Sequence, residues 1–152
     1  MNNTVTYIKS IAIPVLVGAL IGLITSGSMN LDILQKPFLF PPAALFPIVW
    51  TILYTLMGVS YGILKTNNQT DAEIDRIYYI QLAVNALWSI IFFTLKWRLF
   101  AFIWILLLIA LVVTMIKLFY EKNQTAGLLQ IPYLIWITFA AYLNLAIYIL
   151  NG

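Results

Sequence analysis

The side chains of this chain that could do chemistry are indoles, phenols and amides set in apolar surroundings. Three pairs of residues stand four apart, which places both members of a pair on one face of a helix: Trp50 with Tyr54, Gln81 with Asn85, and Trp136 with Ala140. An aromatic ring can stack on a flat ligand, and an amide can bond its polar edge. The pattern therefore predicts an interior wall that binds a flat, largely apolar ligand.

Two amides in the third apolar stretch of the chain must face the protein interior. An amide left without a partner in hydrocarbon costs several kcal/mol, and Gln81 and Asn85 share their face with Trp88. Two readings stay open and are compatible with each other: hydrogen bonds between helices, and contact with a ligand. Asn144, in the last apolar stretch, needs an interior partner for the same reason.

Three further residues complete the set of candidate ligand contacts. Phe139 adds a ring beside Trp136, and the small Ala140 leaves room there for a plate-like ligand or for a neighbouring helix. Lys36 stands between the first two apolar stretches, where its ammonium group could pair with a ligand carboxylate at the mouth of a pocket. The expected ligand thus has an apolar body and polar edges.

The residues that are missing exclude several kinds of chemistry. The chain has no His and no Cys, so thiolate nucleophiles, imidazole bases and the commonest zinc and haem ligands are excluded. We expect neither a metal site nor a resident cofactor. No charged residue lies in the middle of an apolar stretch, which argues against ion-coupled transport. The net charge of +3 comes from Lys and Arg near the ends of those stretches, which indicates headgroup contact rather than nucleic-acid binding.

Composition indicates that these residues are positioned by helices in a membrane. Of the 152 residues, 63% are hydrophobic and only 9% are charged, whereas a soluble domain is about a quarter charged. Five stretches are long enough for a span of about 20 residues. We predict an all-α integral membrane protein, a single domain over residues 1–152, with transmembrane helices over about 5–25, 43–64, 74–95, 99–120 and 125–150.

The connection between the first two spans is too apolar for a disordered loop. We expect a short helix around Leu31 to Gln35 that caps the bundle and ends before Lys36-Pro37, because the residue before proline avoids helical geometry. Glycines four apart recur at 18 and 22 and at 58 and 62, and we favour close packing within one subunit over dimerisation. The small size favours a bacterial plasma membrane, with the N-terminus in the cytoplasm.

Three blocks of sequence resemble those of the tryptophan-rich sensory protein family, whose animal members are called translocator protein or peripheral benzodiazepine receptor. The match runs from Lys36 to Asn144. The blocks are Lys36-Pro37, Pro41-Pro42 and Phe46-Pro47-x-x-Trp50-x-x-Leu53-Tyr54-x-x-Met57-Gly58; Gln81-Leu82-x-x-Asn85-x-x-Trp88-Ser89 with Phe92-Phe93; and Pro132-Tyr133-Leu134-x-Trp136-x-x-Phe139-Ala140-x-x-Leu143-Asn144.

This resemblance implies five transmembrane helices, often in a homodimer, around a pocket closed by the first loop. Members bind porphyrins and synthetic isoquinoline-carboxamide or benzodiazepine-type ligands, some bind sterols, and some bacterial members promote light-dependent breakdown of protoporphyrin IX. The pocket residues that the resemblance implies here are Trp50, Tyr54, Gln81, Asn85, Trp88, Trp136, Phe139, Ala140 and Leu143.

The chain departs from the family pattern in two places. The sterol signature of some members ends in a tyrosine followed by a basic residue, but no Lys or Arg follows Tyr148. Specific cholesterol recognition is therefore not expected. Many members also carry an aspartate early in the fourth span, where this chain is apolar around Ile103 to Ile105.

Three hypotheses follow for the function. The first is a membrane protein that binds protoporphyrin IX and promotes its light- and oxygen-dependent degradation, with the indoles of Trp50 and Trp136 as the catalytic groups. The second is a passive transporter or sensor of porphyrins or other apolar metabolites, without chemistry. The third is a structural partner of other membrane proteins, in which the amides and indoles serve packing alone.

Overall fold

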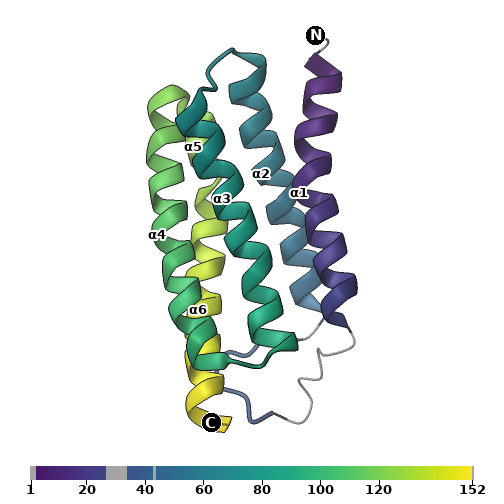
Figure 1. The fold of residues 1–152 in the computed structure, drawn as a ribbon, viewed down its shortest axis with the longest axis vertical. Coiled ribbons are helices and arrows are strands. Elements are labelled where there is room, and N and C mark those ends of the chain that lie inside the picture. The colour runs from purple at the N-terminus through teal and green to yellow at the C-terminus, as the bar shows by residue number, and fades with distance from the viewer. Residues whose placement is uncertain (1–2, 27–33, 43, 152) are drawn as a thin grey trace.

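The protein is a bundle of long helices in this computed structural model, which describes residues 3–26, 34–42 and 44–151 (Figure 1). Within these residues, five helical segments are long and apolar enough to cross a membrane. They are α1 (Asn3–Thr25), α2 (Leu45–Thr66), α3 (Ala72–Ser89) continued by the π-helix η2 (Ile90–Thr94), α4 (Arg98–Lys122), and α5 (Gln124–Leu128) followed by α6 (Ile131–Asn151). The predicted all-α membrane bundle is confirmed.

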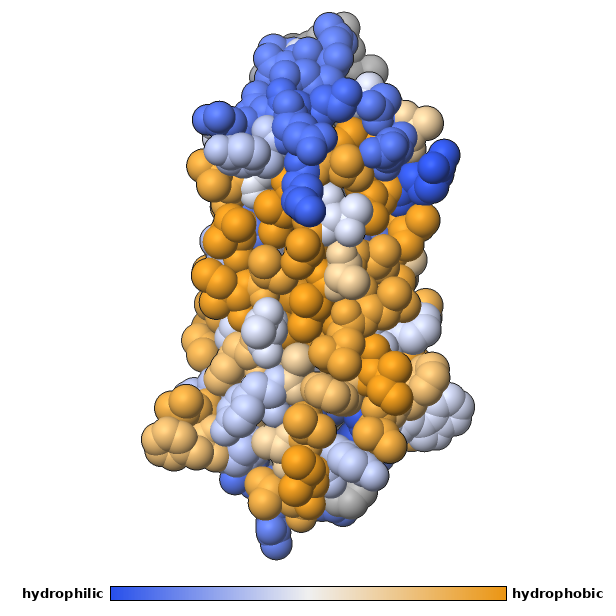
Figure 2. All heavy atoms as spheres, turned by 90° about the vertical axis from the view of Figure 1, so that its left-hand side faces the viewer, coloured by the Kyte–Doolittle hydropathy of each residue, from blue (hydrophilic) through white to orange (hydrophobic). Residues whose placement is uncertain are grey.

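The two ends of the bundle differ in polarity. Figure 2 shows a broad apolar band around the middle and a strongly hydrophilic end above it. This polar end holds the connections at 67–71 and Asn123, and the opposite end, here called the loop end, holds residues 34–42 of the first connection (Figure 1). An apolar band around the bundle is the surface that the hydrocarbon core of a bilayer requires. The loop end is mixed in polarity, with Phe38, Leu39 and Ile149 exposed there.

The third span begins with a side-chain cap at the polar end. Asp71 Oδ1 accepts a hydrogen bond from the backbone N–H of Ile74 at 2.8 Å, and Lys122 Nζ lies 3.1 Å from Asp71 Oδ2. The Ile74 N–H and then the Lys122 ammonium group lower the pKa of the Asp71 carboxyl, since both stabilise its charged form. The cap and the ion pair together join the start of α3 to the end of α4.

Two predicted spans prove less regular than the sequence suggested. The predicted helix over 74–95 widens into a π-helix at Ile90, where the N–H of Leu95 donates to the carbonyl of Ile90 at 3.0 Å. The predicted helix over 125–150 is broken after Leu128, because Pro132 has no N–H to donate and its ring would crowd the carbonyl of Leu128. Pro132 instead lies in the first turn of α6, where proline is tolerated.

Glycines let α1 and α2 pack closely. A Cβ atom on Gly58 would lie 2.4 Å from the Cα of Ile11, and one on Gly62 would lie 2.7 Å from the ring of Tyr7. The glycine pair at 58 and 62 therefore serves helix packing within one chain, which is the reading that the sequence favoured. This contact is the most extensive one that α1 makes.

The first connection is only partly described. The short helix expected around Leu31 to Gln35 falls largely on residues 31–33, which lie outside the described residues. The described part is irregular, with a turn at Phe38-Leu39 closed by a hydrogen bond of 3.3 Å from the N–H of Phe40 to the carbonyl of Pro37.

Candidate functional site

A cavity of about 720 Å³ lies in the loop-end half of the bundle. Its volume falls within the range of about 300 to 1,000 Å³ that is usual for small-molecule pockets. The second half of α1 forms one wall, the start of α2 forms another, and the end of α3, η2 and the first half of α6 close the rest. The lining residues are Val15, Gly18, Ala19, Ile21, Gly22, Leu23, Thr25, Ser26, Phe46, Pro47, Trp50, Thr51, Tyr54, Trp88, Ser89, Phe93, Trp136 and Ala140.

Trp50, Tyr54 and Trp136 form an aromatic corner on this cavity. The rings of Trp50 and Tyr54 stack with centroids 5.5 Å apart, and the ring of Trp136 meets that of Trp50 edge to face at 6.4 Å and 88°. Two walls of the cavity therefore offer indole surfaces at a right angle to each other. Such a corner can hold the face of a flat ligand against one indole and its edge against the other.

The indole nitrogen of Trp136 is a buried donor without a hydrogen-bond partner among the described residues. A buried donor left unpaired costs about 1 to 3 kcal/mol. Trp88, on the opposite side, is different, because its Nε1 donates to Asn144 Oδ1 at 3.0 Å, and Asn144 Nδ2 donates to the carbonyl of Arg98 at 2.8 Å. Of these two indoles, Trp136 is thus the one whose N–H is unpaired.

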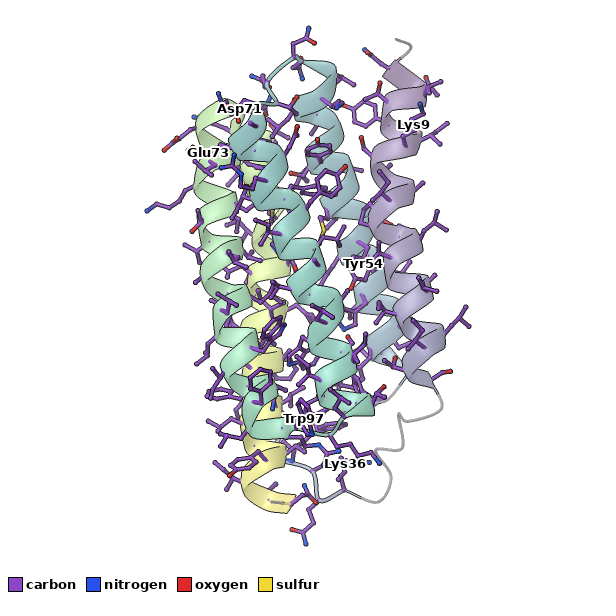
Figure 3. All side chains as sticks on the ribbon, viewed as in Figure 1. Lys9, Lys36, Tyr54, Asp71, Glu73 and Trp97 are labelled. Carbon is purple, nitrogen blue, oxygen red and sulfur yellow. The ribbon has the colours of Figure 1, made fainter. Side chains whose placement is uncertain are left out.

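The two predicted amides lie behind the cavity wall rather than on it. Tyr54 points into the interior at mid-height (Figure 3), and its hydroxyl donates to Asn85 Oδ1. Asn85 Nδ2 donates to the hydroxyl of Tyr133 at 2.8 Å, which in turn donates to Gln81 Oε1 at 2.8 Å. Both amides are buried and neither lines the cavity. In this state they bond between helices, which is one of the two readings that the sequence left open.

A smaller void of about 20 Å³ adjoins the cavity, and two further residues that were predicted to face the interior line this void. Leu143 and Asn144 line it from α6, and Trp88 and Ala140 line both spaces. A void of this size can hold about one water molecule when polar partners are present. Leu143 is therefore separated from the main cavity by the small side chain of Ala140.

Two predicted contacts lie farther from the cavity. Phe139 does not line it and instead packs its ring on that of Trp136, with centroids 5.7 Å apart. Lys36 lies at the loop end (Figure 3), where its Nζ is 5.6 Å from the ring centroid of Phe40. Lys36 is exposed, so its ammonium group is free to meet a charged group that approaches the bundle from this end.

The first connection is fastened to the end of α6 by side chains. The backbone N–H of Gln35 donates to Asn151 Oδ1 at 3.0 Å, and Asn151 Nδ2 donates to the carbonyl of Gln35 at 2.9 Å. The hydroxyl of Tyr142 donates to the carbonyl of Phe38 at 2.7 Å. These three bonds hold the described part of the connection across the loop end of the bundle, next to the cavity.

Sequence reasoning missed the contribution of α1 to the cavity. Gly18 lies so close to Tyr54 that a Cβ atom there would be 2.5 Å from its ring, whereas a Cβ atom on Gly22 would meet nothing within 4 Å. Gly22 therefore opens the cavity instead of packing against a helix. The spacing of these two glycines was visible in the sequence, but it predicts close packing, and only the position of α1 separates the two roles.

Comparisons with known proteins agree with these observations. The model of the TspO/MBR family matches residues 10–150. The tryptophan-rich protein TspO of Archaeoglobus fulgidus is 41% identical over 120 residues, which cover 78% of this chain and 77% of that protein. Protein CrtK of Rhodobacter capsulatus is 37% identical over 134 residues, 86% of this chain and 83% of its own. The translocator protein of Ovis aries is 34% identical over 115 residues, which cover 73% of this chain and 68% of that protein.

Proposed function

This chain belongs to the TspO/MBR family, and we propose that its cavity binds tetrapyrroles such as protoporphyrin IX and promotes their photo-oxidative degradation. The observation that carries the proposal is the right-angled pair of indoles, Trp50 and Trp136, on one cavity of about 720 Å³. A plate-like macrocycle is a shape that such a corner accommodates, because one indole can lie along its face and the other can meet its edge.

The lining suits a ligand that is mostly apolar and carries acceptors at its edge. Trp136 offers an unpaired buried N–H, and a carbonyl or carboxylate oxygen would satisfy it. Lys36 is exposed at the loop end and is proposed to attract a ligand carboxylate as it enters. The same features support binding of isoquinoline-carboxamide or benzodiazepine-type ligands, which combine flat rings with a carbonyl group.

The chemistry that we propose needs only light, oxygen and an indole in contact with the macrocycle. The porphyrin absorbs the light and, in its excited state, accepts one electron from Trp50 or Trp136. The indole radical that remains is held against the ring, where it can react with it, and oxygen removes the electron from the porphyrin. The role of the protein is to hold the indoles in place and to exclude other reaction partners.

A passive transporter or sensor is the second candidate. It is favoured by the position of the cavity at one end of the bundle, next to the first connection. The described residues of that connection, 34–42, are fastened to α6 by hydrogen bonds from Gln35, Tyr142 and Asn151. Release of that connection would open a route for an apolar ligand without chemistry. We further propose that the protein is a single-domain homodimer in the cell membrane.

A titration followed by illumination separates these functions. Purified protein in lipid vesicles is titrated in the dark with protoporphyrin IX while Trp fluorescence is followed, and porphyrin absorbance is then recorded under light. Saturable quenching with loss of absorbance faster than in protein-free vesicles supports degradation. Saturable quenching without faster loss supports a carrier or sensor, which is then tested by porphyrin flux across vesicles in the dark. Absence of saturable quenching overturns tetrapyrrole binding.

A further inference from the structure

We infer that a series of tyrosines conducts oxidising equivalents from the cavity to the polar end of the bundle, where Tyr61 and Asp75 form the terminal site. An oxidising equivalent is here the absence of one electron. The path starts at the aromatic corner of the cavity, but its terminal site lies outside the cavity. Only the oxidant named below, a photo-excited tetrapyrrole, rests on the proposed function.

The series begins at the aromatic corner of the cavity. Trp50 lies between Trp136 and two tyrosines, with ring centroids 6.4 Å from Trp136, 5.5 Å from Tyr54 and 6.5 Å from Tyr133. An electron missing from either indole can therefore be replaced from a neighbouring ring without any ligand or side chain having to move. Tyr54 and Tyr133 are both buried, and they extend the aromatic contacts away from the cavity.

Hydrogen bonds continue this path toward the polar end. The hydroxyl of Tyr133 donates to Gln81 Oε1 at 2.8 Å, and Gln81 Nε2 donates to the carbonyl of Tyr78 at 2.9 Å. Gln81 is fully buried, so the connection from Tyr133 to Tyr78 runs through packed protein. Electron transfer through hydrogen bonds and packed atoms is far faster than transfer across open space.

Three tyrosine rings lie together at the far end of the path. Tyr78 and Tyr61 stack with centroids 4.3 Å apart and planes within 8° of parallel, and Tyr79 meets them edge to face at 5.2 Å and 6.0 Å. Tyr61 and Tyr78 are buried, whereas Tyr79 is 42% exposed. The hydroxyl of Tyr61 donates to Asp75 Oδ1 at the polar end.

Asp75 makes Tyr61 the end of the path. A phenol that loses an electron becomes a strong acid, so it is oxidised most easily where a base can take its proton. The hydroxyls of Tyr54 and Tyr133 donate to amide oxygens, which are poor bases, whereas Tyr61 donates to a carboxylate. Among the described residues, Tyr78 has no hydrogen-bond partner for its hydroxyl.

A lysine beside Tyr61 disfavours loss of an electron from its ring unless the hydroxyl proton leaves as well. Lys65 Nζ lies 5.9 Å from the ring centroid of Tyr61. A positive charge at that distance opposes a second positive charge on the ring, so it disfavours a tyrosine radical cation. It does not oppose the neutral radical that forms once the proton has moved to Asp75.

The step balances in electrons and protons. The excited tetrapyrrole gains one electron and leaves an indole radical cation at Trp50. One electron moves from Tyr61 to Trp50, the O–H bond of Tyr61 breaks, and its proton forms an O–H bond on Asp75. The products are the intact indole, a neutral tyrosyl radical and a carboxylic acid. A water-soluble thiol at the polar end can then restore Tyr61 by supplying one hydrogen atom, and Asp75 loses its proton to water.

The relay can be tested without any ligand in the cavity. The azide radical, a neutral oxidant selective for indoles, is generated by pulse radiolysis in detergent solutions of the full chain, in a Trp97→Phe background because Trp97 is exposed. We expect the indolyl absorption to decay as the phenoxyl absorption grows, at a rate independent of protein concentration. Tyr61→Phe, which keeps the stacked ring, should lose most of the phenoxyl yield and prolong the indolyl lifetime.

Asp75→Asn supplies the decisive comparison. It keeps the shape of the side chain but removes the base, so the phenoxyl yield should fall as it does in Tyr61→Phe. Tyr120→Phe is the matched control, since Tyr120 is also near the polar end and is more exposed. The proposal is overturned if both test variants keep the phenoxyl yield of their background, or if Tyr120→Phe lowers it equally. Circular dichroism melts confirm that each variant is folded, and failure to bind tetrapyrroles leaves this test unaffected.

Discussion

The indole of Trp136 meets the indole of Trp50 edge to face, with ring centroids 6.4 Å apart, and its own N–H has no partner among the described residues. Two electron-rich rings therefore line one cavity. Their stacking surfaces and their redox chemistry can be separated by substitution, because phenylalanine keeps a ring but is much harder to oxidise.

Replacing both indoles should abolish degradation while preserving binding. Trp50→Phe with Trp136→Phe keeps two aromatic walls, so protoporphyrin IX should still quench the remaining Trp fluorescence saturably in the dark. The rate of porphyrin loss under light should fall to that of protein-free vesicles. Trp97→Phe, an exposed indole outside the cavity, should behave as the parent. Degradation by the double variant at the parental rate would disprove the indole mechanism.

Gly22 and Gly58 each belong to a pair of glycines four residues apart, but substitution should change the stability of the protein differently at the two positions. Gly58→Ala forces a Cβ atom to within 2.4 Å of the Cα of Ile11, and such overpacking costs about 1 to 3 kcal/mol. Gly22→Ala meets open space inside α1 and should not lower the free energy of unfolding but raise it by up to about 1 kcal/mol, because alanine favours a helix more than glycine does. Gly22→Leu should fill part of the cavity and weaken protoporphyrin binding. Denaturant titrations in detergent measure the first two, and equal losses of stability would contradict the assigned roles.

The hydroxyl of Tyr133 should support the bundle more than a typical tyrosine hydroxyl. Tyr133→Phe leaves Asn85 Nδ2 and Gln81 Oε1 without that partner, and a buried unpaired polar group costs about 1 to 3 kcal/mol. Tyr148→Phe makes the same change outside this network and should cost little. The comparison is made on the free energies of unfolding of the two variants. Indistinguishable values would show that the network contributes no net stability.

Fastening of the first connection should control how quickly a ligand leaves. Asn151→Ala removes both hydrogen bonds to the backbone of Gln35, so the connection should detach more often and bound protoporphyrin should dissociate faster. Stopped-flow displacement in the dark measures this rate. Asn67→Ala removes an amide at the polar end, where it caps α2, and should not change it. An unchanged rate in Asn151→Ala would exclude this end as the exit.

Lowering the pH should destabilise the polar end of the bundle, because it protonates the carboxylate of Asp71. Its pKa in the folded protein is lowered, so its charged form stabilises the fold above the unfolded value of about 4. That stability is lost as the pH falls through the folded pKa. Thermal melts from pH 7 downward should show this loss in the parent and less of it in Asp71→Asn, which still caps α3.

The amides show how far sequence alone could determine the site. Gln81 and Asn85 had to be interior because hydrocarbon offers them no partner, and both are buried. The sequence could not name the tyrosine hydroxyls that pair with them, since Tyr54 and Tyr133 lie 31 to 52 residues away on α2 and α6. Contacts between helices depend on how the helices rotate and tilt against one another, which no local pattern specifies.

By itself, the sequence determined the five apolar helices and the interior position of Gln81 and Asn85, because bilayer thickness and the cost of buried amides are local constraints. Only the tertiary structure decided that α1 supplies a wall of the cavity, that Gly22 opens it while Gly58 packs, and that Trp136 keeps a free donor while Trp88 does not. These outcomes depend on the distance between atoms on different helices. That distance is set by the packing of the whole bundle.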